Sequence, residues 1–476
     1  MFGLASGRRV FQAILFLGLF TLAVRNVDDP DVWWHLKTGE YIAAHKSVPR
    51  TDPFSSTRFG QPWVAHEWLT DLGLYELYRA TGLAGPILLF AVMVTAALIV
   101  LYLRCGSAAY VAGAITLLGA FATRPVWGVR PQIISLLMTS FWLLILERSE
   151  KNPELLWWTV PLTLLWVNLH AGFALGLAVY AVFILGALIE AGFSHNLHSG
   201  LLHPAALVFG IDILIVPLNP NGLRMYSYPF ETLRSSAMQN YIAEWASPNF
   251  HRAEYLPFLL LVLATFVALA CSRASLRARD LLLLLASLFA SLESIRLIPF
   301  FVLIAVPIIS RRLPTWPRSD SHLRPAWPRT AINLAIILAL AGFAAIHSQQ
   351  VIGGQPAIEA EVFPARAVAF LKLHPPEGRI FNHYNWGGYL IWKLHPPIQV
   401  FIDGRADLYG EQFFHDFADA YQLKDDWQQI LHRWQVETVI VPSDSALALG
   451  LQEDHDWSIE YHDAQATIFA ISRMSR

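Results

Sequence analysis

Residues 10–36 read VFQAILFLGLFTLAVRNVDDPDVWWHL. The apolar run over residues 10–25 follows Arg8 and Arg9, and it approaches the roughly 20 residues that cross a bilayer as a helix. Because no small-residue cleavage site follows it and further apolar runs do, we interpret it as an uncleaved first span rather than a signal peptide. The acidic and aromatic stretch after it therefore stands at the mouth of a membrane helix, where a ligand at the water–lipid boundary can be bound.

Composition supports a membrane protein along most of the chain. Of 476 residues, 55% are hydrophobic and 15% are charged, and the mean hydropathy is +0.42, which is too apolar for an ordinary soluble domain. The net charge of −2 gives no reason to expect nucleic acid. We predict about eleven transmembrane helices, at about residues 10–25, 82–103, 107–123, 131–147, 154–169, 172–191, 201–218, 255–272, 280–294, 297–310 and 330–346.

The distribution of arginine and lysine predicts the orientation. Alternate loops carry most of these residues, including the proline- and arginine-rich linker at 311–329, and such loops face the cytoplasm. With the N-terminus inside and an odd number of spans, the C-terminus lies outside. We predict a multi-pass protein of the bacterial cytoplasmic (inner) membrane with an extracytoplasmic C-terminal domain.

Two domains are expected. Residues 1–346 form the helical membrane bundle, which includes a first outer loop at 26–81. Residues 347–476 form a small α/β domain, since this length suffices for one domain. Within it, 365–373 and 412–434 have helical patterns, and 399–402, 438–441 and 466–471 have strand patterns.

On this topology, residues that can bind ligands or transfer protons gather on the outer side. Ionisable residues near membrane depth are costly and tend to mark function. The candidate site residues are Asp29, Asp31, Trp34, His35, His66, Glu67, Arg130, His170, Glu244 and Arg296. Each has a simpler interpretation taken alone: the tryptophans as interfacial anchors, the arginines as snorkelling to headgroups, the histidines as solvated, and the aspartates as helix caps. Capping explains one aspartate well and three poorly.

These residue types suit glycosyl transfer. A sugar carried on a lipid phosphate leaves behind an anion, so its departure needs cations or a metal. The acceptor hydroxyl needs a carboxylate base within hydrogen-bond reach. Loop carboxylates together with arginines at helix ends supply both requirements.

The chain resembles the GT-C superfamily of integral-membrane glycosyltransferases, which includes protein O-mannosyltransferases, lipid A aminoarabinose transferases and oligosaccharyltransferase catalytic subunits. More closely, it looks like a set of uncharacterised bacterial membrane proteins. The motifs that carry this closer resemblance are DPDVWWHL (29–36), WVAHEW (63–68), WVNLH (166–170), LNPNG (218–222), EW (244–245), NWGGYL (385–390) and FIDGRAD (401–407).

The superfamily resemblance implies roles for single residues. The superfamily's first-loop motif often reads Pro-Asp-Glu, and Pro30-Asp31 matches its first two positions, so Asp31 is expected to be the catalytic carboxylate. Val32 stands at the third position, so a second carboxylate must come from Asp29 or Glu67. A divalent cation, Mg or Mn, is an option at Asp29 and Asp31. From their predicted place on the outer side, and not from the resemblance, the residues expected to bind substrate are Trp34, His35, His66, Arg130, His170, Glu244 and Arg296, with Arg130 and Arg296 at outer helix ends holding the donor phosphate.

The resemblance implies transfer of a sugar from a polyprenyl-phosphate donor to a glycan, lipid or protein acceptor on the outer face. Two alternatives stay open: a transporter or flippase-like protein, and a non-catalytic scaffold for envelope glycan assembly. In the tail, the glycines at 387–388 could form a tight turn near a ligand or a simple hairpin. The 403–407 segment could bind sugar hydroxyls, or Asp403 and Arg405 could form an internal salt bridge.

Overall fold

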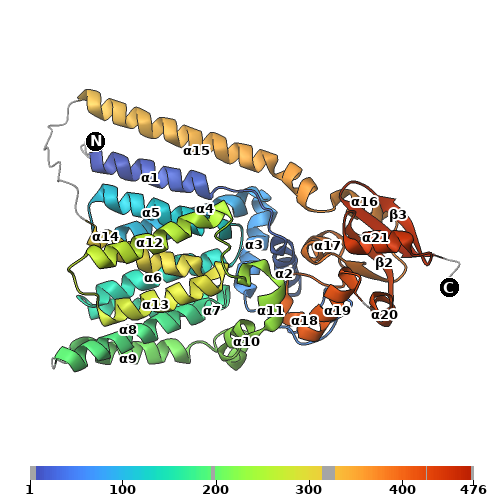
Figure 1. Cartoon of the computed structure of the whole chain (residues 1–476), viewed down its shortest axis with the longest axis horizontal. Coiled ribbons are helices and arrows are strands. Elements are labelled where there is room, and N and C mark those ends of the chain that lie inside the picture. Colours follow the sequence, from blue (N-terminus) through green and yellow to red (C-terminus); the bar gives the residue numbers. More distant parts are fainter. Residues whose placement is uncertain (1–6, 195–198, 314–326, 425, 473–476) are drawn as a thin grey trace. The chain divides into compact units, whose positions relative to one another are not determined.

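The structure, a computed structural model, describes residues 7–194, 199–313, 327–424 and 426–472. The chain divides into two compact units, each built from segments far apart in sequence (Figure 1). Unit 1 comprises Met1–Arg25, Ile87–Tyr226 and Ala243–Ile352; unit 2 comprises Asn26–Pro86, Ser227–Ile242 and Gly353–Arg476. The first loop and the C-terminal segment thus share one unit, whereas the division at residue 346 that we expected from the sequence stays a prediction.

Unit 1 is helical in its described residues. A helix coincides with every apolar segment predicted above: α1 Gly7–Ala23, α4 Ala84–Arg104, α5 Ala109–Thr123, α6 Gln132–Ser149, α7 Thr159–Leu169, α8 Phe173–Ser194, α9 Ser199–Leu214, α12 Leu256–Cys271, α13 Ala278–Glu293, α14 Ile298–Arg312 and α15 Trp327–Val362. Short 3-10 helices connect them: η1 Arg124–Val126, η2 Pro153–Trp158, η3 Gly222–Tyr226, η4 Ala243–Trp245, η5 Ala253–Tyr255 and η6 Ile295–Leu297. Within the described ranges, 6 helices are long and apolar enough to cross a membrane.

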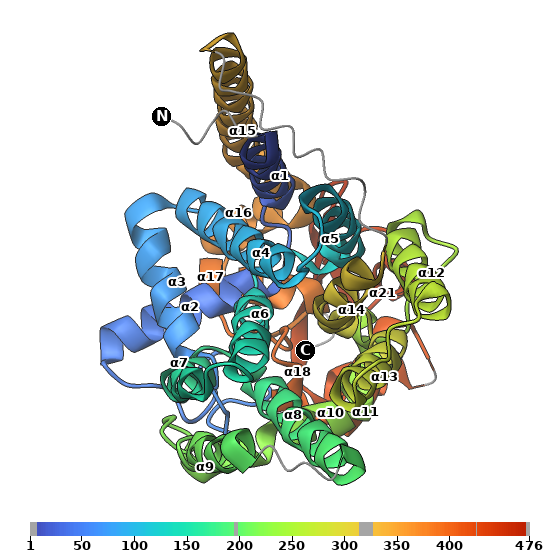
Figure 2. The same cartoon turned by 90° about the vertical axis from the view of Figure 1, so that its left-hand side faces the viewer.

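Helix α14 forms the core of unit 1. It is apolar on all sides and buried along most of its length, as such a helix must be when no face of it can meet water. It packs against α5, α6, α12 and α13, and the end-on view in Figure 2 shows it between these helices. Two candidate residues of unit 1 lie in loops that join these helices: Arg130 between α5 and α6, and Arg296 between α13 and α14.

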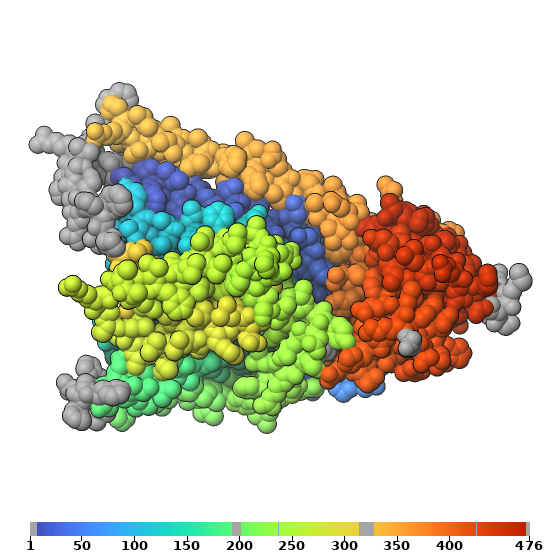
Figure 3. Space-filling model, viewed as in Figure 1, coloured from blue at the N-terminus to red at the C-terminus, as the bar shows by residue number. Residues whose placement is uncertain are grey.

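Helix α15 has the opposite character. It lies at the edge of unit 1 next to α1 (Figures 1 and 2) and along the surface in the space-filling view (Figure 3). Only 6% of its most apolar window is buried. Exposed apolar side chains on it are Ile332, Leu334, Ile336, Leu338, Phe343 and Ile346. An apolar helix with so little protein contact is suited to contact with lipid.

Unit 2 joins helices of the first loop to an α/β core. Its helices are α2 Asp31–His45, α3 Trp68–Thr81, α10 Tyr228–Arg234, α11 Ser236–Tyr241, α16 Ala365–Leu373, η7 Tyr384–Trp386, α17 Gly387–Leu394, α18 Ala406–Tyr409, α19 Glu411–Tyr421, α20 Trp427–Arg433 and α21 Ala446–Glu453. Helix α2 packs against α3 and α17. The predicted helix at 365–373 is confirmed, and the one at 412–434 is divided into α19 and α20 by a left-handed residue at Asp426.

The sheet has the order β1-β2-β4-β3, with β1 Arg379–Asn382, β2 Val436–Pro442, β3 Trp457–His462 and β4 Ala466–Ile471. Strand β1 is parallel to β2, and β4 is antiparallel to both β2 and β3. In β2 and β4, Val439, Ile440, Ile468 and Phe469 are buried, so these central strands form the sheet core. The predicted strands at 438–441 and 466–471 are confirmed.

Two tail predictions were wrong. Residues 399–402 form no sheet strand, because Val400 makes an isolated bridge with Ser55 of the first loop instead. Residues 385–389 form neither a tight turn nor a hairpin, because η7 runs directly into α17. The glycines at 387–388 do allow close approach, but to other parts of the chain: a Cβ at Gly388 would lie 2.5 Å from the Pro30 carbonyl oxygen. Most of the predicted linker at 311–329 lies outside the described residues.

Candidate functional site

The first acidic motif begins helix α2 in unit 2. Asp29 is buried, and its Oδ1 accepts a hydrogen bond from the Asp31 backbone N–H at 2.8 Å. Asp31 is half-buried, and its Oδ1 accepts a hydrogen bond from the Trp34 indole Nε1 at 3.1 Å. Asp29 therefore satisfies a backbone N–H of the first helical turn, as a capping residue does. The Asp31 carboxylate contacts a side chain instead, so capping does not account for it.

The tail backbone lies directly on this motif. A Cβ built at Gly404 would overlap Asp31 Oδ1 and would lie 3.2 Å from Trp34 Nε1. Gly404 is not at a positive φ, so the requirement for glycine here is one of space. Two glycines of the C-terminal segment, Gly388 and Gly404, thus leave room for the Asp29-Pro30-Asp31 motif.

The second acidic motif supplies a buried group of two histidines and two carboxylates. His35 Nδ1 lies 2.6 Å from Asp71 Oδ1, and His35 Nε2 lies 3.5 Å from Glu67 Oε2. Glu67 Oε1 lies 2.7 Å from His66 Nε2, so Glu67 bridges the two histidines. The Trp34 ring lies on the His35 ring, with centroids 3.6 Å apart. We call His35, His66, Glu67 and Asp71 the histidine–carboxylate group.

The acceptors around both histidines indicate imidazolium ions. The two nitrogens of His35 face carboxylates, and those of His66 face Glu67 and the Val64 carbonyl. Burial lowers the pKa of His35, but the Asp71 and then the Glu67 carboxylate outweigh burial and raise it to about 9. Burial similarly lowers the pKa of His66, and Glu67 outweighs it, so the net shift is upward. Burial raises the pKa of Asp71 to about 6, although His35 opposes the change.

These shifts predict how stability depends on pH. Because the pKa of folded His35 lies above its ordinary 6.5, its charge stabilises the folded state fully below about pH 6.5. That contribution is lost as the pH rises through about 9. Asp71, with a pKa of about 6, is already ionised above pH 7.5. We therefore expect the melting temperature of the purified protein in detergent to fall between pH 7.5 and 9.5.

Other groups also titrate near pH 9, so the informative quantity is a difference between variants. His35→Gln should melt lower than the parent at pH 7.5, because it leaves buried carboxylates without their cation, and it should lose most of the additional fall at higher pH. His45→Gln, an exposed position on the same helix, should keep the parent's dependence. Equal slopes for the parent and His35→Gln would show that His35 is not charged in the folded protein.

The same group has a spacing that suits a metal. The ligand atoms of His35, Glu67 and Asp71 lie within 4.8 Å of one another, and no other set of three or more such residues is found in the described part of the chain. Nitrogen and oxygen donors fit Mn²⁺ or Zn²⁺. The cation would have to displace a proton from His35, since both ring nitrogens face acceptors. The sequence prediction placed a cation at Asp29 and Asp31, and that assignment stays a prediction.

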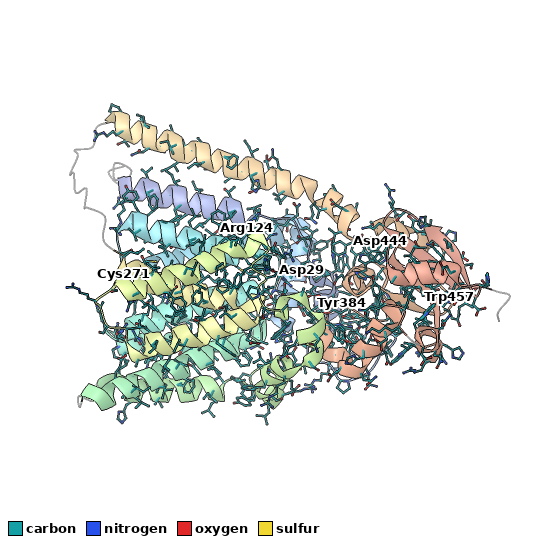
Figure 4. All side chains as sticks on the ribbon, viewed as in Figure 1. Asp29, Arg124, Cys271, Tyr384, Asp444 and Trp457 are labelled. Carbon is teal, nitrogen blue, oxygen red and sulfur yellow. The ribbon has the colours of Figure 1, made fainter. Side chains whose placement is uncertain are left out.

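A second part of unit 2 extends this group to the C-terminal segment. The Tyr228 ring contacts the His66 ring, with centroids 4.5 Å apart, and the Tyr228 hydroxyl donates to Asp407 Oδ2 at 3.1 Å. The Tyr384 hydroxyl donates to the Gly404 carbonyl at 3.5 Å. Burial, and then the charges of Asp31, Asp403, Asp407 and Asp29, raise the pKa of Tyr384 well above its usual range. Figure 4 shows Tyr384 and Asp29 of this unit.

The 403–407 segment divides into a structural and an exposed part. Arg405 is buried and donates to Asp403 and to Asp52 of the first loop, each at 2.7 Å. Its guanidinium lies 5.1 Å from the ring centroid of Phe54 and 4.6 Å from that of Trp63. The salt-bridge alternative for Asp403 and Arg405 is therefore confirmed. Asp407, the other acidic residue of this segment, is exposed.

In unit 1, three predicted substrate-binding residues gather between helices. Arg130 forms an ion pair with Glu244, and the Arg296 guanidinium lies 5.8 Å from the Trp245 ring centroid. A side-chain hydrogen bond keeps the two loops together, since Ser294 Oγ donates to the Glu244 carbonyl at 2.9 Å. Burial raises the pKa of Glu244, but Arg130 and then Arg296 outweigh it and hold the pKa below its ordinary value.

His170 is held in one tautomer in unit 1. Its Nδ1 accepts a hydrogen bond from the Gly172 backbone N–H at 2.9 Å. Ser135 Oγ lies 2.6 Å from the same nitrogen and itself accepts from the Trp166 indole at 2.8 Å. Because an amide N–H can only donate, Nδ1 carries no proton and Nε2 does. His170 therefore presents an N–H donor at the end of α7.

Apart from His170, the candidate residues thus form one group in each unit. Unit 2 brings together Asp29, Asp31, Trp34, His35, His66 and Glu67; unit 1 brings together Arg130, Glu244 and Arg296, and holds His170 in a separate hydrogen-bonded network. Asp71, Tyr228, Tyr384 and Ser135 were missed by the sequence analysis. For Asp71 a signal existed, because Glu67 and Asp71 are four residues apart at the start of α3 and such residues share a helix face. Short-range spacing gives no such signal for the others.

Comparison of the sequence with protein-family models and with curated proteins finds no match. Solved structures do match. One is the archaeal oligosaccharyltransferase AglB from Archaeoglobus fulgidus, in complex with an inhibitory peptide and a dolichol-phosphate, with a TM-score of 0.56, 9% identity, and coverage of 98% of this chain and 75% of that chain. Another is ArnT from Cupriavidus metallidurans bound to undecaprenyl phosphate, with a TM-score of 0.51, 14% identity and 98% coverage of both chains.

At these identities the likeness establishes the fold. The predicted fold class is confirmed in its architecture: an α-helical membrane bundle with a small C-terminal α/β domain, the fold shared with these two solved structures. The number of membrane crossings is not fixed by the comparison.

Proposed function

We propose that this protein is a membrane glycosyltransferase that moves a sugar from a polyprenyl-phosphate donor to an acceptor on the outer face of the cytoplasmic membrane. The observation that carries the proposal is the fold match over 98% of the chain to two proteins that were solved with dolichol-phosphate or undecaprenyl phosphate. The chemistry of the two residue groups supports it independently, since one is rich in carboxylates and the other contains arginines.

The proposed reaction assigns a task to each group. An acceptor oxygen or nitrogen bonds to the anomeric carbon of the sugar, and the bond between that carbon and the phosphate oxygen breaks. The bonding electrons leave with the polyprenyl phosphate, so negative charge grows on the phosphate. Asp31 takes the proton that the acceptor loses, as a general base must, and Arg130 and Arg296 stabilise the departing phosphate.

The arginines can be tested by binding alone. Arg296 holds the phosphate through two parallel N–H donors in this account, and lysine offers only a point charge. We expect Arg296→Lys to weaken the binding of undecaprenyl phosphate by about 10-fold, measured by native mass spectrometry of the protein in detergent. Arg130 is less informative, because its replacement also breaks the ion pair with Glu244.

The matched control is Arg252→Lys, which changes an exposed arginine of the same unit and should leave lipid-phosphate binding unchanged. If Arg296→Lys binds undecaprenyl phosphate as tightly as the parent does, Arg296 is an interfacial residue and leaves the proposed site.

A divalent cation, Mg or Mn, belongs to the proposal as an option. When bound, it would supply positive charge to the leaving phosphate. Asp29 and Asp31 are the residues proposed to hold it, and His35, Glu67 and Asp71 are a second set with suitable spacing.

The outer-face location rests on the arginine and lysine distribution. We expect a periplasmic reporter enzyme fused after Ser348 or at the C-terminus to be active in a bacterial host. An active cytoplasmic reporter at the C-terminus would instead place the tail inside and overturn the proposed orientation.

A further inference from the structure

The sequence analysis expected a second carboxylate beside Asp31 from Asp29 or Glu67, and in the structure both of these residues have other tasks. Asp29 Oδ1 accepts the Asp31 backbone N–H. Glu67 bridges two histidines, with contacts of 2.7 Å to His66 and 3.5 Å to His35. Neither is exposed: each keeps 8% of its surface accessible. A carboxylate that binds substrate must be accessible, and an accessible carboxylate of unit 2 lies in another segment, at Asp407.

Asp407 is the exposed end of a series of side-chain contacts in unit 2. A continuous series of contacts runs from buried Asp71 through His35, Glu67 and His66 to Tyr228, and the Tyr228 hydroxyl donates to Asp407 at 3.1 Å. The first members of the series are buried, whereas Asp407 is exposed. A rigid, hydrogen-bonded support behind an accessible carboxylate is the arrangement that positions a ligand-binding group.

Asp407 is also close to Asp31 through shared neighbours. It lies three residues after Gly404, whose backbone rests against Asp31 Oδ1. The Tyr384 hydroxyl donates to the carbonyl of the same Gly404 at 3.5 Å. The contact at Gly404 thus brings a carboxylate of the first loop and one of the tail into the same part of unit 2, although they are far apart in sequence.

We propose that Asp407 is the second carboxylate of the substrate site and accepts a hydrogen bond from an O–H or N–H of the bound sugar or acceptor. The inference rests on the proposed glycosyltransferase function and makes the C-terminal segment part of that site. The ligand chemistry, a neutral hydroxyl or an amine, is shared by the donor sugar and the acceptor, so the test must separate the two.

The experiment uses the full chain in detergent with a panel of undecaprenyl-phosphate hexoses and pentoses, and it measures release of undecaprenyl phosphate with water or added saccharide as acceptor. Asp407→Asn should lower turnover by about 10- to 100-fold, as expected for loss of a hydrogen bond to a charged group. Its binding of sugar-free undecaprenyl phosphate and its melting temperature should match the parent. Asp444→Asn, an exposed aspartate elsewhere in the tail, is the matched control and should behave like the parent.

The kinetics identify which group Asp407 binds. A raised donor KM, with water as well as with saccharide as acceptor, assigns the bond to the donor sugar. Unchanged release to water with loss of saccharide-stimulated release assigns it to the acceptor. Both results support the proposal.

Tyr228→Phe removes the hydrogen bond that positions Asp407 but leaves the carboxylate in place. It should therefore lower turnover, and by less than Asp407→Asn does. Turnover of Asp407→Asn equal to that of the parent, at an unchanged melting temperature, overturns the inference. A parent that binds no undecaprenyl phosphate and turns over no donor contradicts the proposed function itself, which is a distinguishable failure.

Discussion

Asp31→Asn is expected to lower sugar transfer by about 10²–10⁴-fold, the usual loss when a positioned general base is removed. Asparagine retains an oxygen that can accept the Trp34 indole hydrogen bond, so the start of α2 should stay intact. What is lost is the ability to take the acceptor's proton. The effect should appear in the rate constant for release of undecaprenyl phosphate, whereas the affinity for undecaprenyl phosphate should not change.

The matched control for Asp31 is Asp28→Asn, three residues earlier in the same acidic stretch and exposed. It should transfer sugar at the parent's rate. If Asp31→Asn inserts normally and turns over donor like the parent, then Asp31 is only a helix-start residue, and Glu67 becomes the next base to test.

Gly404→Ala should have the second large effect, without altering any functional group. The added methyl would overlap Asp31 Oδ1 and press on the Trp34 indole, so the carboxylate must move. A misplacement of about 1 Å can cost about 10²-fold in rate, and we expect a loss of that order in donor turnover. Because Gly404 does not have a positive φ, the backbone itself can accept alanine, and the melting temperature should fall only modestly.

Two comparisons make the Gly404 result specific. Gly73→Ala adds a methyl in α3 of the same unit, where nothing lies within 4 Å, and it should be neutral or slightly stabilising. The double variant Asp31→Asn with Gly404→Ala should be no slower than Asp31→Asn alone, since both changes remove one function. Additive losses, or full activity of Gly404→Ala at unchanged stability, would contradict the position of Asp31 in the site.

Local patterns predicted most of the helices and the central strands. Apolar runs of near-membrane length correspond to helices in unit 1, because a long apolar segment has few other stable conformations in lipid. Alternating β-branched and aromatic residues correspond to β2 and β4. The segment at 399–402 has the same composition but pairs with Ser55, and a partner so far away in sequence leaves no periodic signal.

Part of the candidate site could likewise be predicted, because it is formed by residues that are close together in sequence. The segments at 29–36 and 63–68 each place carboxylate, histidine and tryptophan side chains within a few positions of one another. A local pattern was therefore enough to identify them as segments of a candidate site. For the tail, the sequence left open that the 403–407 segment binds sugar hydroxyls, but it gave no sign of the contact between Gly404 and Asp31. Gly404 and Asp407 reach Asp31 and Tyr228 across separations that only tertiary packing defines, and the sequence patterns predicted the tail as a separate α/β domain.

The central claim is that this protein transfers sugar from a polyprenyl-phosphate donor. The most direct measurement is to incubate the parent protein in liposomes with undecaprenyl-phosphate hexoses and pentoses, and to quantify released undecaprenyl phosphate by mass spectrometry beside Asp31→Asn. The account predicts release from at least one donor by the parent and a loss of about 10²-fold or more in Asp31→Asn. Binding of the lipid phosphate without release from any donor, equal in parent and variant, would contradict it and would favour a transporter or a scaffold with this fold.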